Sequence, residues 1–201
     1  NFWYVLYVQT GEYLNNIGHV EINKDDFSKS TAKLVAIESI VIGDGDETFL
    51  QIEKDAYDDY EAYAKHVVIK DFPLNLISDR KYARSVELSL GNLIADAIFD
   101  YGSQDGHHVD MGVMPGGGIS ADLNKGDLTI GHILSVIPFG NTYVSIEATG
   151  QDIIDMLEVS LQSDVSVDDD GNYLYDEKAQ NYLIGEFGGF LQVSGARFEY
   201  S

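Results

Sequence analysis

The chain has 201 residues, 44% of them hydrophobic, which is enough for one large domain or two small ones. Its 34 acidic and 12 basic residues give a formal net charge of −22. Because every phosphate contact needs a cation, this balance argues against nucleic acid and anionic membrane surfaces as partners. The absence of cysteine excludes disulfides, thiolate metal sites and cysteine nucleophiles. No apolar run approaches the roughly 18 residues of a membrane span.

The first part of the chain has the composition of β-strands. Residues 2–8 are aromatic and β-branched, residues 17–22 alternate apolar and polar side chains, and residues 33–42 predict a third strand. The chain begins inside the first of these apolar strands, without an initiator Met or a signal peptide. We therefore expect a processed or subcloned piece of a longer protein.

An amphipathic helix is predicted over residues 47–66. Apolar residues recur there at three- and four-residue spacing with acids between them: Phe49, Ile52, Ala56, Tyr60 and Tyr63. A helix between two strand-rich blocks is typical of an inter-domain connector.

After Pro73 the pattern predicts a second unit of short elements. Residues 90–101 predict a helix that is buried on most of its circumference. Another helix begins after Thr149, which forms a capping box with Asp152. Strands are expected over residues 109–114, 143–148 and 190–200, and an exposed acidic loop over residues 164–180.

Three consecutive glycines, Gly116, Gly117 and Gly118, follow the strand predicted over residues 109–114. Glycine adopts positive φ and lets a ligand approach the backbone closely. Successive free N–H groups in such a turn form an anion-binding nest. The alternative is a tight turn at a strand end, and a phosphate loop of the G-x-x-x-x-G-K-[ST] type is absent.

Two further stretches have the chemistry to bind a ligand. Phe139 is held between a proline and a glycine, so its ring could stack on a planar ligand such as a nucleobase, or anchor a buried loop. Arg80, Lys81 and Arg84 form the one basic cluster of a very acidic chain. They could clamp a small anion, or pair with neighbouring acids on a solvated surface.

Metal-binding and nucleophile signals are weak. The adjacent His107 and His108 point in opposite directions on an extended chain, which favours loop histidines over a metal site. Residues 168–172 are only loosely similar to a calcium loop, because the glycine is in the fourth position and no Glu is in the twelfth. No G-x-S-x-G elbow occurs.

Several stretches, in order and in register, resemble the C-terminal domain of the 5'-nucleotidase family. The matching stretches are residues 87–97, 115–119, 126–131, 136–141 and 190–195. Residues 8–13 and 17–20 are in turn similar to the closing strands of that family's metallophosphatase domain.

The resemblance implies an α+β fold of layered sheets and helices, preceded by a few strands and a linker helix. Residues 1–46 would be the last strands of a truncated metallophosphatase domain, residues 47–70 the inter-domain linker, and residues 71–201 a C-terminally truncated substrate-binding domain. Two divalent metal ions are expected on the missing N-terminal catalytic domain and none in this chain. The implied partner is a nucleotide or nucleoside-like small molecule, and the implied location is extracellular, cell-surface or periplasmic in a bacterium.

The resemblance also assigns site residues by position. Phe139 is similar to one of two aromatics that stack the base, and Gly116, Gly117 and Gly118 to the backbone wall beside it. Asn141 matches a polar contact to the nucleoside. Arg84, and Arg80 with it, fall near an arginine that contacts the substrate. No catalytic residue is expected in this chain.

Two positions depart from the family pattern Asn-Gly-Gly-Gly-Ile-Arg. Pro115 replaces the Asn and Ser120 replaces the Arg, so a side-chain amide and a charge are absent. These departures favour a different phosphorylated substrate. They equally suit the alternative that the chain is a non-catalytic binding or interaction module with the family fold.

Overall fold

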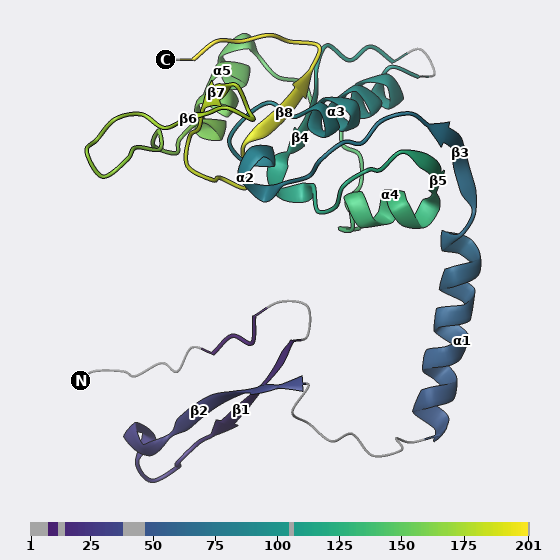
Figure 1. Cartoon of the computed structure of the whole chain (residues 1–201), viewed down its shortest axis with the longest axis vertical. Helices are drawn as coiled ribbons and strands as arrows, with labels where there is room; N and C mark the ends of the chain where they lie inside the picture. Colours follow the sequence, from purple (N-terminus) through teal and green to yellow (C-terminus); the bar gives the residue numbers. More distant parts are fainter. Residues whose placement is uncertain (1–7, 12–14, 38–46, 105–106, 201) are drawn as a thin grey trace. The chain divides into compact units, whose positions relative to one another are not determined.

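A computed structural model describes residues 8–11, 15–37, 47–104 and 107–200 (Figure 1). The chain divides into two compact units, Asn1–Tyr57 and Asp58–Ser201. The strand predicted over residues 2–8 lies almost entirely outside the described residues, as do residues 38–42 of the third predicted strand.

The described part of the first unit contains an antiparallel hairpin. β1 (Asn16–Glu21) pairs with β2 (Thr31–Ala36), and Gly18 lies opposite Leu34. The connection contains a 3₁₀ turn, η1 (Phe27–Lys29), which Asp26 caps by accepting a hydrogen bond from the Ser28 N–H. The alternation of residues 17–22 therefore predicted its strand correctly.

The helix predicted over residues 47–66 is confirmed as α1 (Glu47–Ala64). Its apolar stripe is not buried, since Ile52, Tyr60 and Tyr63 are all at least half exposed. The role of α1 as an inter-domain connector stays a prediction.

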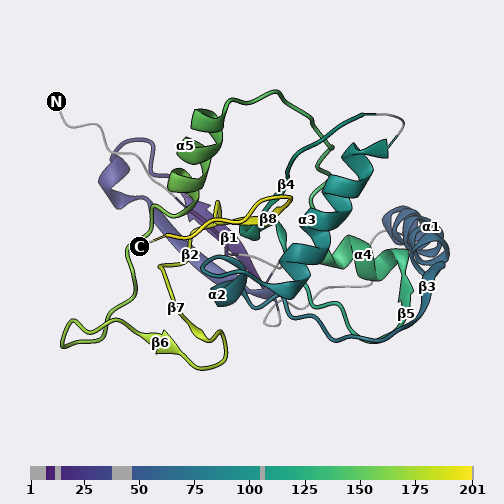
Figure 2. The ribbon, with the colours of Figure 1, turned by 90° about the horizontal axis from the view of Figure 1, so that it is seen from above.

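The second unit combines small antiparallel sheets with short helices. β3 (Val67–Phe72) pairs with β5 (Gly126–Thr129), and β4 (Gly112–Pro115) pairs with β8 (Leu191–Ser194). α3 (Ser89–Gly102) packs against β4 and β8 (Figures 1 and 2), and α4 (Ile130–Val136) follows β5 directly. The main core cluster comprises Leu90, Ile119, Leu123, Leu128 and Val136.

The prediction that α3 is buried on most of its circumference is wrong. Leu90 and Ala95 are fully buried, but Leu93 is 41% exposed and Tyr101 is 61% exposed. The sheet of β4 and β8 covers one side of the helix only, so the apolar residues on its other side remain in solvent.

The strand predicted over residues 143–148 does not form. Val144 and Ile146 are 72% and 79% exposed, and the segment has no ladder partner among the described residues. Tyr143 alone is fixed by packing, with its ring edge-on to Tyr101 at 5.3 Å between centroids. Alternating apolar residues need a partner strand to become a sheet, and the part of the chain that the structure describes supplies none to this segment.

α5 (Gly150–Ser160) begins as predicted at Thr149, whose side chain and that of Asp152 form a reciprocal capping box. At its other end the buried Ser160 hydroxyl accepts a hydrogen bond from the Leu191 N–H at 2.8 Å. This bond ties α5 to β8.

The acidic segment that the sequence predicts as a loop is a hairpin, β6 (Tyr175–Asp176) with β7 (Asn181–Tyr182). An isolated bridge between Val165 and Ile184 extends the pairing. The charged side chains of this acidic segment are mainly exposed. The predicted exposure is therefore confirmed, although the backbone forms paired strands. We call residues 164–186 the acidic hairpin.

Buried Gln192 on β8 fixes the segment that follows α2 (Arg80–Ala83). Its Nε2 donates hydrogen bonds to the carbonyl oxygens of Ala83 and Val86 at 3.1 and 2.9 Å. Its Oε1 accepts one from the Leu88 N–H at 2.9 Å. One side chain therefore satisfies three backbone groups that helix packing would otherwise leave unpaired.

Candidate functional site

The triple glycine forms a single 3₁₀ turn, η4 (Gly116–Gly118), at the end of β4; we call it the Gly loop. A Cβ on Gly116 would overlap the carbonyl oxygen of Ala83, and one on Gly117 would lie 2.8 Å from the carbonyl oxygen of Gly188. None of the three glycines has a positive φ. Glycine is required here because two other backbone segments approach closely, which corrects the expectation of a left-handed turn.

The Gly loop does not present a row of free N–H groups. The Gly116 N–H donates to the carbonyl oxygen of Phe190 at 2.7 Å, and the Gly117 N–H donates to that of Gly188 at 2.8 Å. The anion-binding nest predicted from three consecutive glycines is therefore wrong for these two groups. The loop is a fixed backbone wall.

Arg84 lies against this wall. It is the residue that ends α2, and its carbonyl oxygen accepts a hydrogen bond from the Phe187 N–H at 3.1 Å. Its Nη1 lies 3.9 Å from the point that a Cβ on Gly188 would occupy. Among the described residues no carboxylate lies within ion-pair distance of the half-buried Arg84 side chain.

Arg80, at the start of α2, has a different environment. Its Nε lies 3.0 Å from Oε2 of Glu186, and the two side chains are 66% and 46% exposed. The resemblance places both arginines near the substrate. Arg80 begins the short helix α2 and forms an ion pair with Glu186, whereas Arg84 caps the end of that helix and has no ion-pair partner among the described residues.

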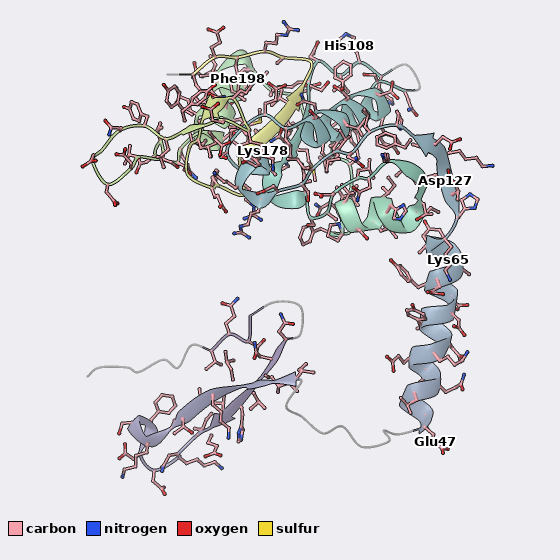
Figure 3. The ribbon with its side chains drawn as sticks, viewed as in Figure 1. Glu47, Lys65, His108, Asp127, Lys178 and Phe198 are labelled. Carbon is pink, nitrogen blue, oxygen red and sulfur yellow. The ribbon has the colours of Figure 1, made fainter. Side chains whose placement is uncertain are left out.

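The acidic hairpin is anchored to α2 by a second cluster. Lys81 Nζ lies 2.8 Å from Oδ2 of Asp176, and the Tyr82 hydroxyl donates to the same carboxylate. Lys178, labelled in Figure 3, lies over the Tyr82 ring at 4.8 Å from its centroid. The Lys81 ammonium, together with backbone N–H donors such as that of Ala179, lowers the pKa of Asp176 from 3.8 to about 2.

Phe139 projects from an open loop, residues 137–142, which we call the Phe139 loop. The Ser120 N–H, just beyond the Gly loop, donates to the carbonyl oxygen of Val136 at 2.8 Å and so fixes where the Phe139 loop begins. The Phe139 ring is 54% exposed, so it is not the buried loop anchor that was the alternative. Within the loop, the Asn141 N–H donates to the Phe139 carbonyl oxygen, and a Cβ on Gly140 would meet nothing within 4 Å.

The two departures from the family pattern flank the Gly loop. Pro115 ends β4 opposite Leu191, and both Pro115 and Ser120 are exposed. Neither Pro115 nor Ser120 supplies a charge or a side-chain amide to the surface around the Gly loop. Arg80 and Arg84 are the guanidinium groups near it.

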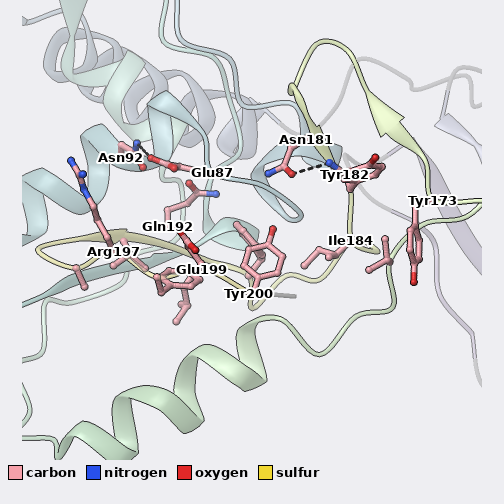
Figure 4. A pocket seen from close by; sticks show the side chains of 16 residues that line it. Glu87, Asn92, Tyr173, Asn181, Tyr182, Ile184, Gln192, Arg197, Glu199 and Tyr200 are labelled. Atoms are coloured by element: carbon pink, nitrogen blue, oxygen red, sulfur yellow. Dashed lines mark hydrogen bonds between the residues drawn. The ribbon is translucent and has the colours of Figure 1, made fainter.

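Sequence reasoning missed a cavity of about 1280 Å³ that the described residues form (Figure 4). Its walls come from the acidic hairpin, β8 and the segment that follows β8, and neither the Gly loop nor Phe139 lines it. Asn92 also lines it, with Nδ2 donating to Glu87 at 2.6 Å and with its buried Oδ1 unpaired. No local motif could have revealed it, because its lining residues are scattered between residues 87 and 200.

A metal site is not formed by the described residues, which contain no group of three or more His, Cys, Asp or Glu side chains that could hold an ion. His108 Nδ1 lies 3.5 Å from Asp110 Oδ1, and both side chains are exposed. The Asp168 carboxylate accepts hydrogen bonds from the side chain and backbone of Asn172, which lower its pKa. No described helix has both the length and the apolar character needed to cross a membrane.

Curated relatives match parts of the chain. The trifunctional nucleotide phosphoesterase protein YfkN of Bacillus subtilis (strain 168) is 38% identical over 88 residues, 44% of this chain and 6% of the relative. The 5'-nucleotidase of Vibrio parahaemolyticus is 30% identical over 119 residues, 55% of this chain and 20% of the relative. The chain therefore spans no more than a fifth of either protein.

The fold has a counterpart among solved structures. The crystal structure of the 5'-nucleotidase precursor from Thermus thermophilus superposes with a TM-score of 0.52 and 28% sequence identity. The match covers 94% of this chain and 33% of that one, and it confirms the predicted mixed α and β architecture. A family model described as the 5'-nucleotidase C-terminal domain matches residues 68–201, which is well over half of the chain. The chain thus belongs to the 5'-nucleotidase C-terminal domain family.

Proposed function

We propose that this chain is the substrate-binding part of a secreted, metal-dependent phosphohydrolase that acts on nucleotides or related phosphoesters. Its relatives are named nucleotide phosphoesterases and 5'-nucleotidases, which supports a hydrolase of phosphoric esters. Phe139 would stack the base, the Gly loop would form the wall beside it, and Asn141 would bind the nucleoside through its amide. Arg84 and Arg80 would bind the polar or anionic part of the substrate.

One observation carries this proposal: the exposed Phe139 stands on a loop whose start is hydrogen-bonded to Ser120, two residues beyond the fixed glycine wall. The Ser120–Val136 hydrogen bond joins the residue just beyond the Gly loop to the start of the Phe139 loop, and Arg84 Nη1 lies 3.9 Å from the point that a Cβ on Gly188 would occupy. Phe139 is 54% exposed, so a bound ligand would bury apolar surface on it. A planar base offers a face that stacks on such a ring.

Phosphoester cleavage is assigned to another domain of the protein. The described residues do not fit a two-metal site, so no step through a metal is derived for this chain. We propose that the two divalent ions belong to an N-terminal metallophosphatase domain, that residues 1–46 are its last strands, and that residues 47–70 link it to the substrate-binding domain of residues 71–201. An extracellular, cell-surface or periplasmic location is part of the same proposal, and one relative is a cell wall protein of Listeria monocytogenes.

Isothermal titration of adenosine and AMP into the full-length protein tests the role of Phe139. Base stacking contributes about 1–3 kcal/mol, so Phe139→Ala should weaken adenosine binding roughly five- to hundredfold. Phe139→Tyr keeps the ring and should retain most of the affinity. Tyr173→Ala removes a ring that is 67% exposed on the acidic hairpin and serves as the matched control. Equal affinities of wild type and Phe139→Ala would remove Phe139 from the site.

A second candidate, a non-catalytic binding or interaction module, is favoured by Pro115 and Ser120, which leave the Gly loop without the flanking amide and charge of the family pattern. Phosphate release from nucleotides by the full-length protein with Mn²⁺ or Zn²⁺ separates the two candidates. Release supports the hydrolase, whereas nucleoside binding without release supports the module.

A further inference from the structure

Arg80 and Glu186 form an ion pair at the edge of the candidate site. Arg80 Nε lies 3.0 Å from Oε2 of Glu186. Two residues beyond Glu186, the carbonyl oxygen of Gly188 accepts the hydrogen bond of Gly117 in the Gly loop. The carboxylate is therefore carried by the same chain segment that packs against the glycine wall.

The two arginines of the site are not equivalent. Arg80 is the first residue of α2, and Arg84 caps the C-terminal end of that helix four residues later. Arg84 has no carboxylate at ion-pair distance within the described part of the chain, whereas Arg80 is engaged by Glu186. An anionic group that approached both guanidinium groups would also approach the Glu186 carboxylate, which lies 3.0 Å from Arg80 Nε.

We propose that Glu186 sets the charge preference of the substrate site by occupying Arg80 and by repelling ligand groups that carry several negative charges. The inference rests on the proposed function, because it concerns the same site. Under it, Arg84 and Arg80 still bind the anionic part of a nucleotide, but each added phosphate gains less from the two arginines than it would without Glu186.

The effect of Glu186 on ligand affinity is moderate, because the Arg80–Glu186 ion pair is exposed. At 66% and 46% exposure the two charges are screened, so a ligand phosphate can displace the carboxylate at a small cost. A second ion pair, Lys81 with Asp176, holds the acidic hairpin to α2 independently. Removing the Glu186 charge should therefore change ligand preference and leave the fold intact.

The test is isothermal titration of adenosine, AMP and ADP into the full-length protein, at low ionic strength and with a chelator to prevent hydrolysis. Glu186→Gln should raise the affinity for AMP and ADP about three- to tenfold and leave adenosine binding unchanged. The gain should shrink as salt is added. Glu177→Gln removes the same charge from an exposed position on the same hairpin, and should change none of the three affinities.

A double-mutant cycle shows whether Glu186 acts through Arg80. In an Arg80→Gln background, Glu186→Gln should give a clearly smaller gain for AMP than in the wild type. An unchanged AMP-to-adenosine affinity ratio in Glu186→Gln, or an equal change in Glu177→Gln, overturns the inference while adenosine binding still supports the proposed function. If the wild type binds neither adenosine nor AMP, both proposals are overturned.

Discussion

The Gly loop and the Phe139 loop belong to one candidate site, but the chain holds them in different ways. Gly116 and Gly117 each make a backbone hydrogen bond, to Phe190 and Gly188, and leave no room for a Cβ. The Phe139 loop has open space at Gly140 and an exposed ring. The difference indicates that the wall depends on packing for its position, whereas Phe139 lies more than half in solvent.

Two phenylalanines should show the largest contrast in stability. Phe190 is 3% exposed and Phe139 is 54% exposed. Phe190→Ala should lower the free energy of unfolding by about 3–5 kcal/mol, because it leaves a cavity in a packed region. Phe139→Ala should change it by no more than about 0.5 kcal/mol.

Urea unfolding followed by circular dichroism measures both values. A loss of several kcal/mol in Phe139→Ala would mean that its ring supports the fold, and the contrast between wall and loop would not hold.

Two glycines should show the next largest contrast. Gly116→Ala places a methyl group on the Ala83 carbonyl oxygen, and shifting that backbone should cost about 1–3 kcal/mol. Gly140→Ala meets nothing within 4 Å and should be neutral or slightly stabilising. The thermal unfolding midpoints of the two variants are compared with that of the wild type. Equal midpoints for both variants would show that the backbone around Gly116 can shift to accommodate a methyl group.

The smallest effect concerns the contact between the acidic hairpin and α2. The pKa of Asp176 is about 2 in the folded chain against an ordinary value of 3.8, so its ion pair with Lys81 stabilises the fold fully above about pH 5. This contribution should disappear as the pH falls from about 5 to 2. The stabilisation by this ion pair should also weaken at high pH, once the pH exceeds the raised pKa of Lys81.

The difference in unfolding midpoint between the wild type and Asp176→Asn, measured from pH 2 to 7, isolates this contribution. The difference should be largest near neutral pH and approach zero at pH 2. Asp169→Asn, at an exposed carboxylate in the preceding turn, controls for the general effect of removing a negative charge. A difference that does not vary with pH would contradict the assigned ion pair.

Local signals in the sequence predicted those elements that local interactions determine. The spacing of α1 and the Thr149–Asp152 capping box each involve neighbours within four residues, and both are present. The alternation of residues 17–22 also predicted its strand, and β2 supplies the partner that β1 needs. The strand predicted over residues 143–148 fails for the opposite reason. Its pattern is suitable, but a sheet needs a partner from elsewhere in the chain.

The packing of the Gly loop could be predicted from the sequence only in part. Three glycines in a row signal close approach, yet only the fold shows that Ala83 and Gly188 are the groups that approach. The N–H groups of Gly116 and Gly117 donate to the carbonyl oxygens of Phe190 and Gly188, so these two groups do not form the predicted nest. The Arg80–Glu186 pair spans more than a hundred residues of sequence, so no motif could have indicated it.

Photolabelling with 8-azidoadenosine tests most directly whether the exposed ring and the glycine wall bind a base. The full-length protein is irradiated with the probe, digested, and mapped by mass spectrometry, with excess adenosine as competitor. The account predicts competed label on peptides that contain Phe139 or the Gly loop. Competed label confined to peptides that contain Tyr182 or Tyr200, which line the large cavity, would contradict it.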